Sequence, residues 1–180
     1  MSILKVARMG HPALRQRARP IEPRELKTVA LQKLIDDMID TMYEYTGVGL
    51  AAPQVHEGLR LFVASLDEDG KADADPLTII NPEITPVGGT MVEGWEGCLS
   101  IPEIRGRVPR AQHIKLTAVS REGKRLEIDA RDFAARVIQH EADHLDGVLF
   151  LDRMRGFSSL TYMDEFSRYQ TSGDEADEDE

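Results

Sequence analysis

The stretch RDFAARVIQHEADHLDG, residues 131–147, decides the arrangement expected for the rest of the chain. Its apolar residues recur at helical spacing. Asp132 stands near the start, where negative charge favours the helix dipole, and Gly147 stands just past the last apolar residue, where glycine commonly ends a helix. We therefore predict a helix over about residues 131–145.

One face of this predicted helix carries His140 and His144 together with apolar side chains. Two imidazoles one helical turn apart can bind one metal ion. Glu141 follows the first histidine at about 100° around the helix axis. Its carboxylate can therefore reach a water molecule bound to the ion without ligating the ion. The spacing predicts His140 and His144 as metal ligands and Glu141 as an acid–base residue.

A catalytic site of this kind needs a third protein ligand and one open position. An extended motif with histidine at position 150 fails, because Phe150 stands there. Two candidates stay open: Glu165 downstream, as in thermolysin-like metallopeptidases, and Cys98 in WEGCLS, residues 95–100. A thiolate is a strong ligand for borderline ions. A metal site with a purely structural role is a further alternative to a catalytic site, but a structural site would normally have four protein ligands.

The flanking segments predict an α+β fold with mostly antiparallel strands packed around the helix that carries HExxH. A first long helix is expected over residues 23–47, with strands at 59–66 and 77–82, the second ended by Pro82. Alternating residues predict a hairpin over 112–130, and apolar residues at three-residue steps predict a C-terminal helix over 158–170. Residues 67–75 read as a polar loop.

Composition bounds the class of protein. The chain has 180 residues, of which 41% are hydrophobic and 30% charged, which suits one compact domain over 1–170. We expect no membrane-spanning helix and no secretion signal. Cys98 is the only cysteine, so no disulfide partner is expected within the chain, and a reducing, cytoplasmic setting fits. Residues 171–180 are strongly acidic and predict a disordered tail.

A further motif, GVGLAAPQV at residues 47–55, follows the first predicted helix. Its glycines allow another backbone to approach closely. It lacks the Lys-Ser/Thr pair of a phosphate-binding loop. The segment instead favours a substrate-edge loop in which Gln54 places a side-chain amide donor.

In this order, GVGLAAPQ, EGCLS and QHEADHLDG resemble the motifs of the peptide deformylase family, and the resemblance covers most of the chain. It implies hydrolysis of the N-formyl group from the initiator N-formylmethionine of new polypeptides, in bacteria or organelles, and contact with the ribosome. It also implies Cys98, His140 and His144 as metal ligands, Glu141 as acid–base residue, and the Gln54 amide and Leu99 N–H as oxyanion donors. Such enzymes typically use Fe²⁺ and also work with Ni²⁺, Co²⁺ or Zn²⁺.

Substrate contacts are expected on both sides of such a site. We predict that the peptide runs along Val48, Gly49 and Gly97 as an added strand. Val137 and Phe133 lie about one and two turns before His140 and are predicted to line the methionine pocket, although core packing explains them equally well. Three residues depart from the commonest pattern of the family: Thr46, Ala142 and Arg136. Of these, only Arg136 stands near a position that can line the methionine pocket.

Overall fold

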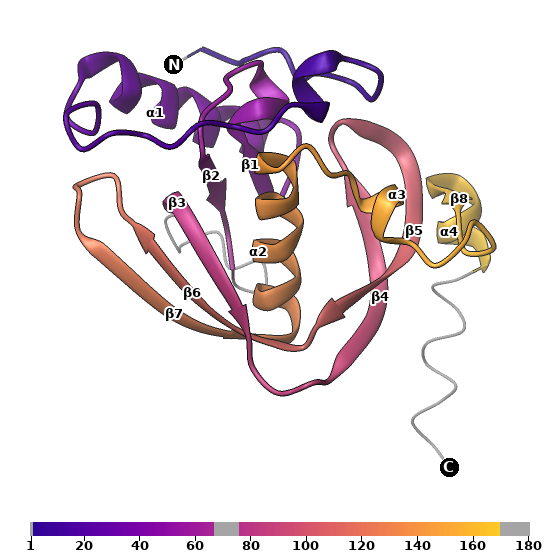
Figure 1. Ribbon diagram of the computed structural model, residues 1–180. Helices are drawn as coiled ribbons and strands as arrows, with labels where there is room; N and C mark the ends of the chain where they lie inside the picture. The colour runs from indigo at the N-terminus through magenta and orange to yellow at the C-terminus, as the bar shows by residue number, and fades with distance from the viewer. Residues whose placement is uncertain (1, 67–75, 170–180) are drawn as a thin grey trace.

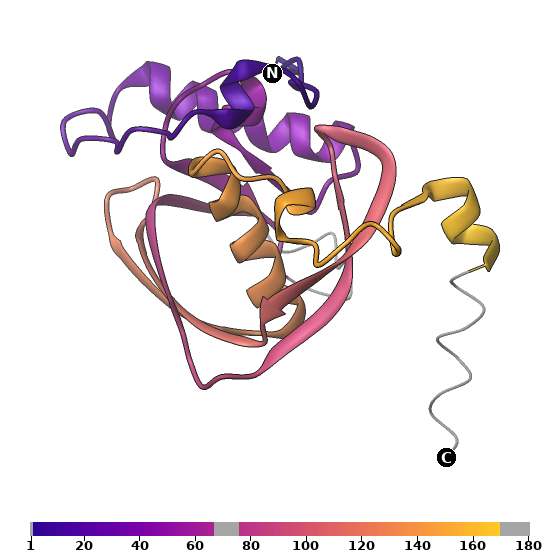
Figure 2. The same cartoon turned by 45° about the vertical axis from the view of Figure 1, so that its right-hand side comes forward.

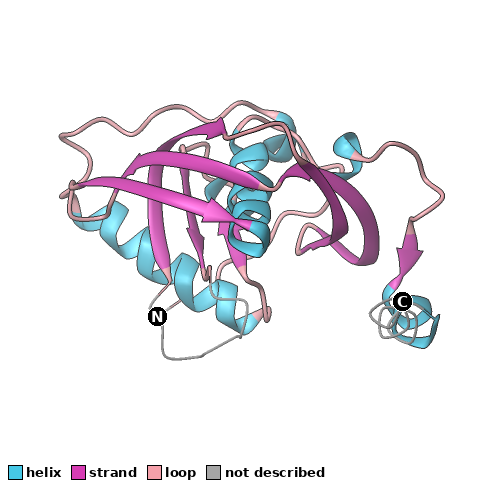
Figure 3. Ribbon diagram, turned by 90° about the horizontal axis from the view of Figure 1, so that it is seen from below, coloured by secondary structure: helices cyan, strands magenta, loops and turns pink. Residues whose placement is uncertain are grey.

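The computed structural model describes residues 2–66 and 76–169; the expected loop 67–75 and acidic tail 171–180 lie outside these residues. Two antiparallel sheets flank one helix, α2 (Asp132–Leu145), as Figures 1 and 3 show. The larger sheet has the order β1-β2-β3-β6-β7, with bounds Gly49–Ala51, Leu61–Ala64, Leu77–Pro86, His113–Val119 and Arg125–Arg131. The smaller has the order β4-β5-β8, with bounds Met91–Cys98, Ile101–Ala111 and Thr161–Tyr162. The predicted α+β class is confirmed.

Helix α2 is buried because its apolar face packs onto the larger sheet. Ala135, Ile138 and Leu145 are fully buried in one cluster that also contains Phe62 and Ile114 from the strands. Burying a side chain such as isoleucine contributes about 1.5–3 kcal/mol. The predicted bounds 131–145 agree with the helix to one residue. Its position between the sheets fixes the direction in which its polar face points.

The first helix, α1 (Val29–Glu44), is shorter than the predicted span 23–47. It begins late because the hydroxyl of Thr28 accepts a hydrogen bond from Leu31 N and caps the helix. It ends early because Thr46 adopts a positive φ of 55° and Gly47 N donates back to Met42 O at 2.9 Å. This C-terminal cap turns the chain directly into β1.

Strand β3 continues through Pro82 to Pro86, so the prediction that Pro82 ends it was wrong. The pairing with β6 shifts register between Ile80 and Glu83, where Asn81 has a φ of 50°. This bulge lets proline sit in the strand without breaking the ladder on both sides. The hairpin predicted over 112–130 is confirmed as β6 and β7, whose register runs from His113↔Arg131 to Val119↔Arg125.

The hairpin of β4 and β5 was not predicted, and it brings Cys98 to the turn between the two strands. The short helix α3 (Phe150–Arg153) follows α2. The last expected helix starts later than predicted, because residues 161–162 pair with β5 as β8 before α4 (Met163–Tyr169) begins. Figure 2 shows β8 and α4 at the outer edge of the smaller sheet. Within residues 2–66 and 76–169, no helix is both long and apolar enough to cross a bilayer.

Candidate metal centre and cleft

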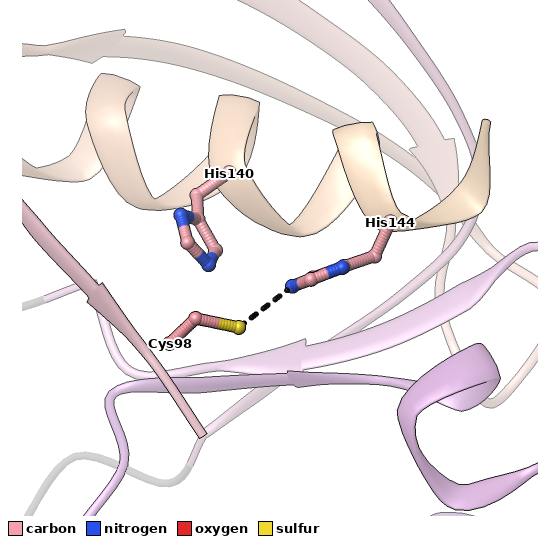
Figure 4. A group of neighbouring side chains, drawn as sticks. All are labelled: Cys98, His140 and His144. Atoms are coloured by element: carbon pink, nitrogen blue, oxygen red, sulfur yellow. Dashed lines mark hydrogen bonds between the residues drawn. The ribbon is translucent and has the colours of Figure 1, made fainter. Parts of the chain in front are cut away.

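Three side chains from two elements converge on one point (Figure 4). His140 and His144 project from successive turns of α2, and Cys98 meets them from the end of β4. One ligand atom from each lies within 4.8 Å of the other two, and Cys98 Sγ is 3.3 Å from His144 Nε2. Among the described residues this is the only such group of three or more.

A buried carboxylate orients the first histidine. Nδ1 of His140 lies 2.8 Å from Oε2 of Glu96, so Nε2 is left to face the convergence point. Arg110 donates to both oxygens of Glu96 at 2.9 and 3.0 Å, and Arg136 donates to Oε1 at 2.9 Å. Burial raises the pKa of Glu96, but the bonds from His140 and Arg110 outweigh burial and lower it from 4.5 to about 2.

Two arginines extend this network to the second half of α2. Arg110 also donates to Asp143, and Arg153 of α3 donates to the same carboxylate at 2.7 and 3.1 Å. The network therefore joins β4, β5, α2 and α3 around the convergence point. Sequence reasoning missed it: Glu96 and Asp143 stand inside the stretches EGCLS and QHEADHLDG, but no sequence spacing links either residue to Arg110.

The thiol and the glutamine amide lie together. Burial raises the pKa of the Cys98 thiol, but His144 and His140 together lower it well below its usual value, so a thiolate is favoured. Gln54 Nε2 lies 3.5 Å from Cys98 Sγ and donates to Ser100 Oγ at 3.2 Å. Its Oε1 accepts from Ala51 N at 2.8 Å, so the amide NH₂ faces the thiol.

Glu141 is almost wholly buried, and its Oε2 has no hydrogen-bond partner within the described part of the chain. Burial raises the pKa of this carboxyl group. Burying a carboxylate oxygen without a hydrogen-bond partner normally costs about 1–3 kcal/mol or more of folding free energy. Oε2 of Glu141 is therefore an acceptor available to a donor such as water. Gly49 lies against the same carboxylate, because a Cβ added there would stand 2.4 Å from Glu141 Oε1.

A cleft of about 810 Å³ opens over this group. Every substrate-contact residue expected from the sequence lines this cleft: Val48, Gly49, Gly97, Phe133 and Val137. It is also lined by two predicted metal ligands, Cys98 and His140, by the acid–base residue Glu141, and by the oxyanion candidates Gln54 and Leu99. Phe133 and Val137 also pack into or against the core cluster, so each has a core contact as well as a place in the cleft wall, and their contact with a methionine side chain stays a prediction. Arg136 lines the cleft, with its guanidinium turned to the carbonyls of Val92 and Val108 at 2.7 and 2.8 Å.

The donor set fits a divalent transition metal. One thiolate and two imidazoles are soft to borderline ligands and leave a fourth position open. Glu165, the alternative third ligand, lies on α4 and pairs with Arg168 at 3.2 Å, outside the group. The remaining histidines also lie elsewhere: His11 and His56 contact each other edge to face, and His113 lies 2.7 Å from Asp129.

Comparison with known proteins places this geometry in a family. A family model described as polypeptide deformylase matches residues 3–159. The chain belongs to the polypeptide deformylase family. Peptide deformylase 2 of Nostoc sp. is 40% identical over 173 residues, covering 94% of this chain and 96% of that protein. Peptide deformylase 2 of Bordetella bronchiseptica is 44% identical over 161 residues, covering 87% and 90%.

Solved deformylase structures share the fold. The peptide deformylase of Thermotoga maritima matches with a TM-score of 0.79 at 40% identity, covering 87% of this chain and all of that chain. A class I type b peptide deformylase of Acinetobacter baumannii, bound to Met-Ala-Ser, matches with a TM-score of 0.79 at 38% identity and 86% and 100% coverage. Membership of this deformylase family disfavours the thermolysin-like alternative, in agreement with the position of Glu165.

Proposed function

We propose that this chain removes the N-formyl group from the initiator N-formylmethionine of newly made polypeptides, with one divalent ion held by Cys98, His140 and His144. The observation that carries the proposal is the convergence of these three donors beside the unpaired carboxylate of Glu141. We propose Fe²⁺, with Ni²⁺, Co²⁺ or Zn²⁺ as substitutes, because thiolate and imidazole donors suit these ions. When bound, the ion lowers the pKa of a water molecule and polarises the formyl carbonyl.

Glu141 moves the proton. Its carboxylate accepts a proton from water while the water oxygen bonds to the formyl carbon. The same carboxyl group then gives the proton to the methionine nitrogen as the C–N bond breaks, so the products are formate and a free amino terminus. General acid–base catalysis of this kind contributes about 10²–10⁴ in rate.

Gln54 and Leu99 stabilise the negative charge that develops on the formyl oxygen. Ala51 N–H holds the Gln54 carbonyl oxygen, so the amide NH₂ is oriented toward the site before substrate arrives. The Leu99 N–H follows Cys98 directly in the turn between β4 and β5. Losing one donor of this type typically costs about 10²–10³ in rate.

The cleft is suited to an extended peptide. Strands β1 and β4 are the edge strands of their sheets, and residues of both line the cleft. A peptide can add a strand to such an edge, with Val48 and Gly49 on one side and Gly97 on the other. Its methionine side chain would lie on Phe133 and Val137, beside the stem of Arg136.

The relatives support this substrate. The Acinetobacter baumannii deformylase binds Met-Ala-Ser, which is the peptide that deformylation of formyl-Met-Ala-Ser would leave. We propose that residues 1–170 form the single catalytic domain around the HExxH helix and act in the bacterial cytoplasm. Contact with the ribosome stays a prediction.

The direct test compares formyl-Met-Ala-Ser with acetyl-Met-Ala-Ser on anaerobically purified protein, with the released acid and the peptide product both identified. Formyl carries hydrogen where acetyl carries a methyl group, and Gly49 lies so close to the Glu141 carboxylate that a single added carbon at position 49 would clash with it. Rapid cleavage of the formyl peptide alone is expected. Equal rates, or cleavage between methionine and alanine, would replace the proposal with a peptidase.

A further inference from the structure

The C-terminal arm, residues 160–169, lies beyond the part of the chain that the family model matches, which ends at residue 159. The arm nevertheless belongs to the fold. Its strand β8 pairs with β5 through Ile104↔Tyr162 and Arg105↔Thr161, and its helix α4 also contacts β5. Figures 1 and 2 show it at the free edge of the smaller sheet.

Two side chains of the arm contact residues that line the cleft. The Phe166 ring meets the Trp95 ring edge to face, with centroids 4.9 Å apart. The Arg105 guanidinium lies over the Phe166 ring, 5.4 Å from its centroid. Arg105 Nε lies 2.7 Å from the sulfur of Met163. The arm is therefore held in place by Trp95 and Arg105.

Met163 itself lines the cleft that contains His140 and Glu141. Trp95, Gly97 and Arg105 line it too. Since Gly97 is on the proposed path of the peptide, a polypeptide that places methionine on Phe133 and Val137 would run on toward Trp95, Arg105 and Met163. The side chains at this end offer an indole, a thioether and an arginine stem, which are mainly apolar surfaces.

We propose that the C-terminal arm forms a subsite wall through which Met163 contacts the polypeptide beyond its methionine and favours a large apolar side chain at the second or third position. The inference rests on the proposed deformylase function. Phe166 has a positioning role, because it touches Trp95 and Arg105 and holds Met163 against the cleft. The arm thus adds selectivity that the matched region, residues 3–159, does not supply.

The test measures kcat/KM for formyl-Met-Ala-Ala, formyl-Met-Leu-Ala and formyl-Met-Ala-Leu with wild type, Met163→Ala, Met163→Leu and Phe166→Ala. Wild type should prefer a leucine peptide. Met163→Ala and Phe166→Ala should reduce that preference by roughly three- to tenfold, the effect of losing one or two buried methylenes. Met163→Leu should keep the preference. Tyr169→Ala, at an exposed position of α4 outside the cleft lining, is the matched control.

A second readout does not depend on turnover. Trp95 is the only tryptophan in the chain, so its fluorescence reports both the seating of Phe166 and peptide binding. The product peptide that carries the preferred leucine, Met-Leu-Ala or Met-Ala-Leu, should shift its emission and bind more tightly than Met-Ala-Ala in wild type but not in Met163→Ala. If wild type hydrolyses all three formyl peptides and Met163→Ala changes them equally, the arm is only structural and the inference is wrong. If wild type hydrolyses none, the proposed function itself has failed.

Discussion

Gly49 leaves the space that the Glu141 carboxylate occupies: a Cβ at position 49 would lie 2.4 Å from Oε1 and 2.7 Å from Cδ of Glu141. Strand β1 and helix α2 therefore approach each other closely at the one side chain that carries the proposed proton transfer. A contact this short cannot form, so any side chain at position 49 must displace either the strand or the carboxylate.

Gly49→Ala should consequently lower kcat/KM on formyl-Met-Ala-Ser by at least about tenfold, since small misplacements of a catalytic group cost up to about 10²-fold. Bound metal should stay near one ion per chain, because the three atoms nearest to the added methyl all belong to Glu141. Gly58→Ala is the control, because a Cβ there has nothing within 4 Å. Equal activity of the two variants would show that Glu141 needs no fixed position.

Cys98→Ala should empty the metal site, because it removes one of three converging donors, whereas Glu165→Ala should keep both metal and activity. The two residues were the competing third ligands, and only Cys98 lies in the group. Metal analysis of the two purified variants measures the difference. Loss of metal in Glu165→Ala with retention in Cys98→Ala would reverse the assignment.

Arg136→Met should lower the free energy of unfolding by roughly 2–3 kcal/mol, because it removes one of the two arginines that donate to a buried carboxylate and leaves two strand carbonyls without their charged donor. Arg136 donates to Glu96, Val92 and Val108, and its side chain is mostly buried. Arg136→Lys should recover part of the loss, since lysine supplies charge but no planar fork. Urea unfolding at constant slope measures both, and a change below about 0.5 kcal/mol would show that the network does not depend on Arg136.

At acid pH, the surface ion pair of Arg19 and Glu25 should stop contributing to the free energy of unfolding. Hydrogen bonds from Arg19, then from the Glu22 backbone N–H, lower the pKa of Glu25 from 4.5 to about 2. Because the folded pKa is the lower one, the contribution is full above pH 4.5 and disappears as the pH falls toward 2. The stability difference between wild type and Glu25→Gln should therefore shrink over this range. A difference independent of pH would contradict the assignment.

Local patterns predicted the parts of the fold that depend on neighbouring residues. The helix that carries His140 and the hairpin of β6 and β7 follow from periodicity. The residues predicted for the site line one cleft, except His144, which joins Cys98 and His140 beneath it. The start of α1 was misplaced because the Thr28 cap outweighs helix-compatible residues before it. Pro82 was misread because a bulge at Asn81 accommodates it.

Features that join distant segments escaped prediction. Strand β4 is rich in glycine and charged residues, so its pairing with β5 had no alternating signal to reveal it. Glu96 likewise acquires its role only when folding brings Arg110 and His140 to it. The entry of Met163 into the cleft depends on the pairing of β8 with β5 and was equally invisible.

We propose that Glu141 moves a proton in a site whose metal is held by Cys98, His140 and His144. The decisive experiment is Glu141→Gln, assayed on formyl-Met-Ala-Ser with metal content measured on the same sample. We expect close to one ion per chain together with a fall in kcat/KM toward the upper end of the roughly 10²–10⁴ that acid–base catalysis contributes. A variant that kept its metal and at least about a tenth of wild-type kcat/KM would show that Glu141 does not transfer the proton, and one that lost its metal would show that Glu141 is needed to hold the ion.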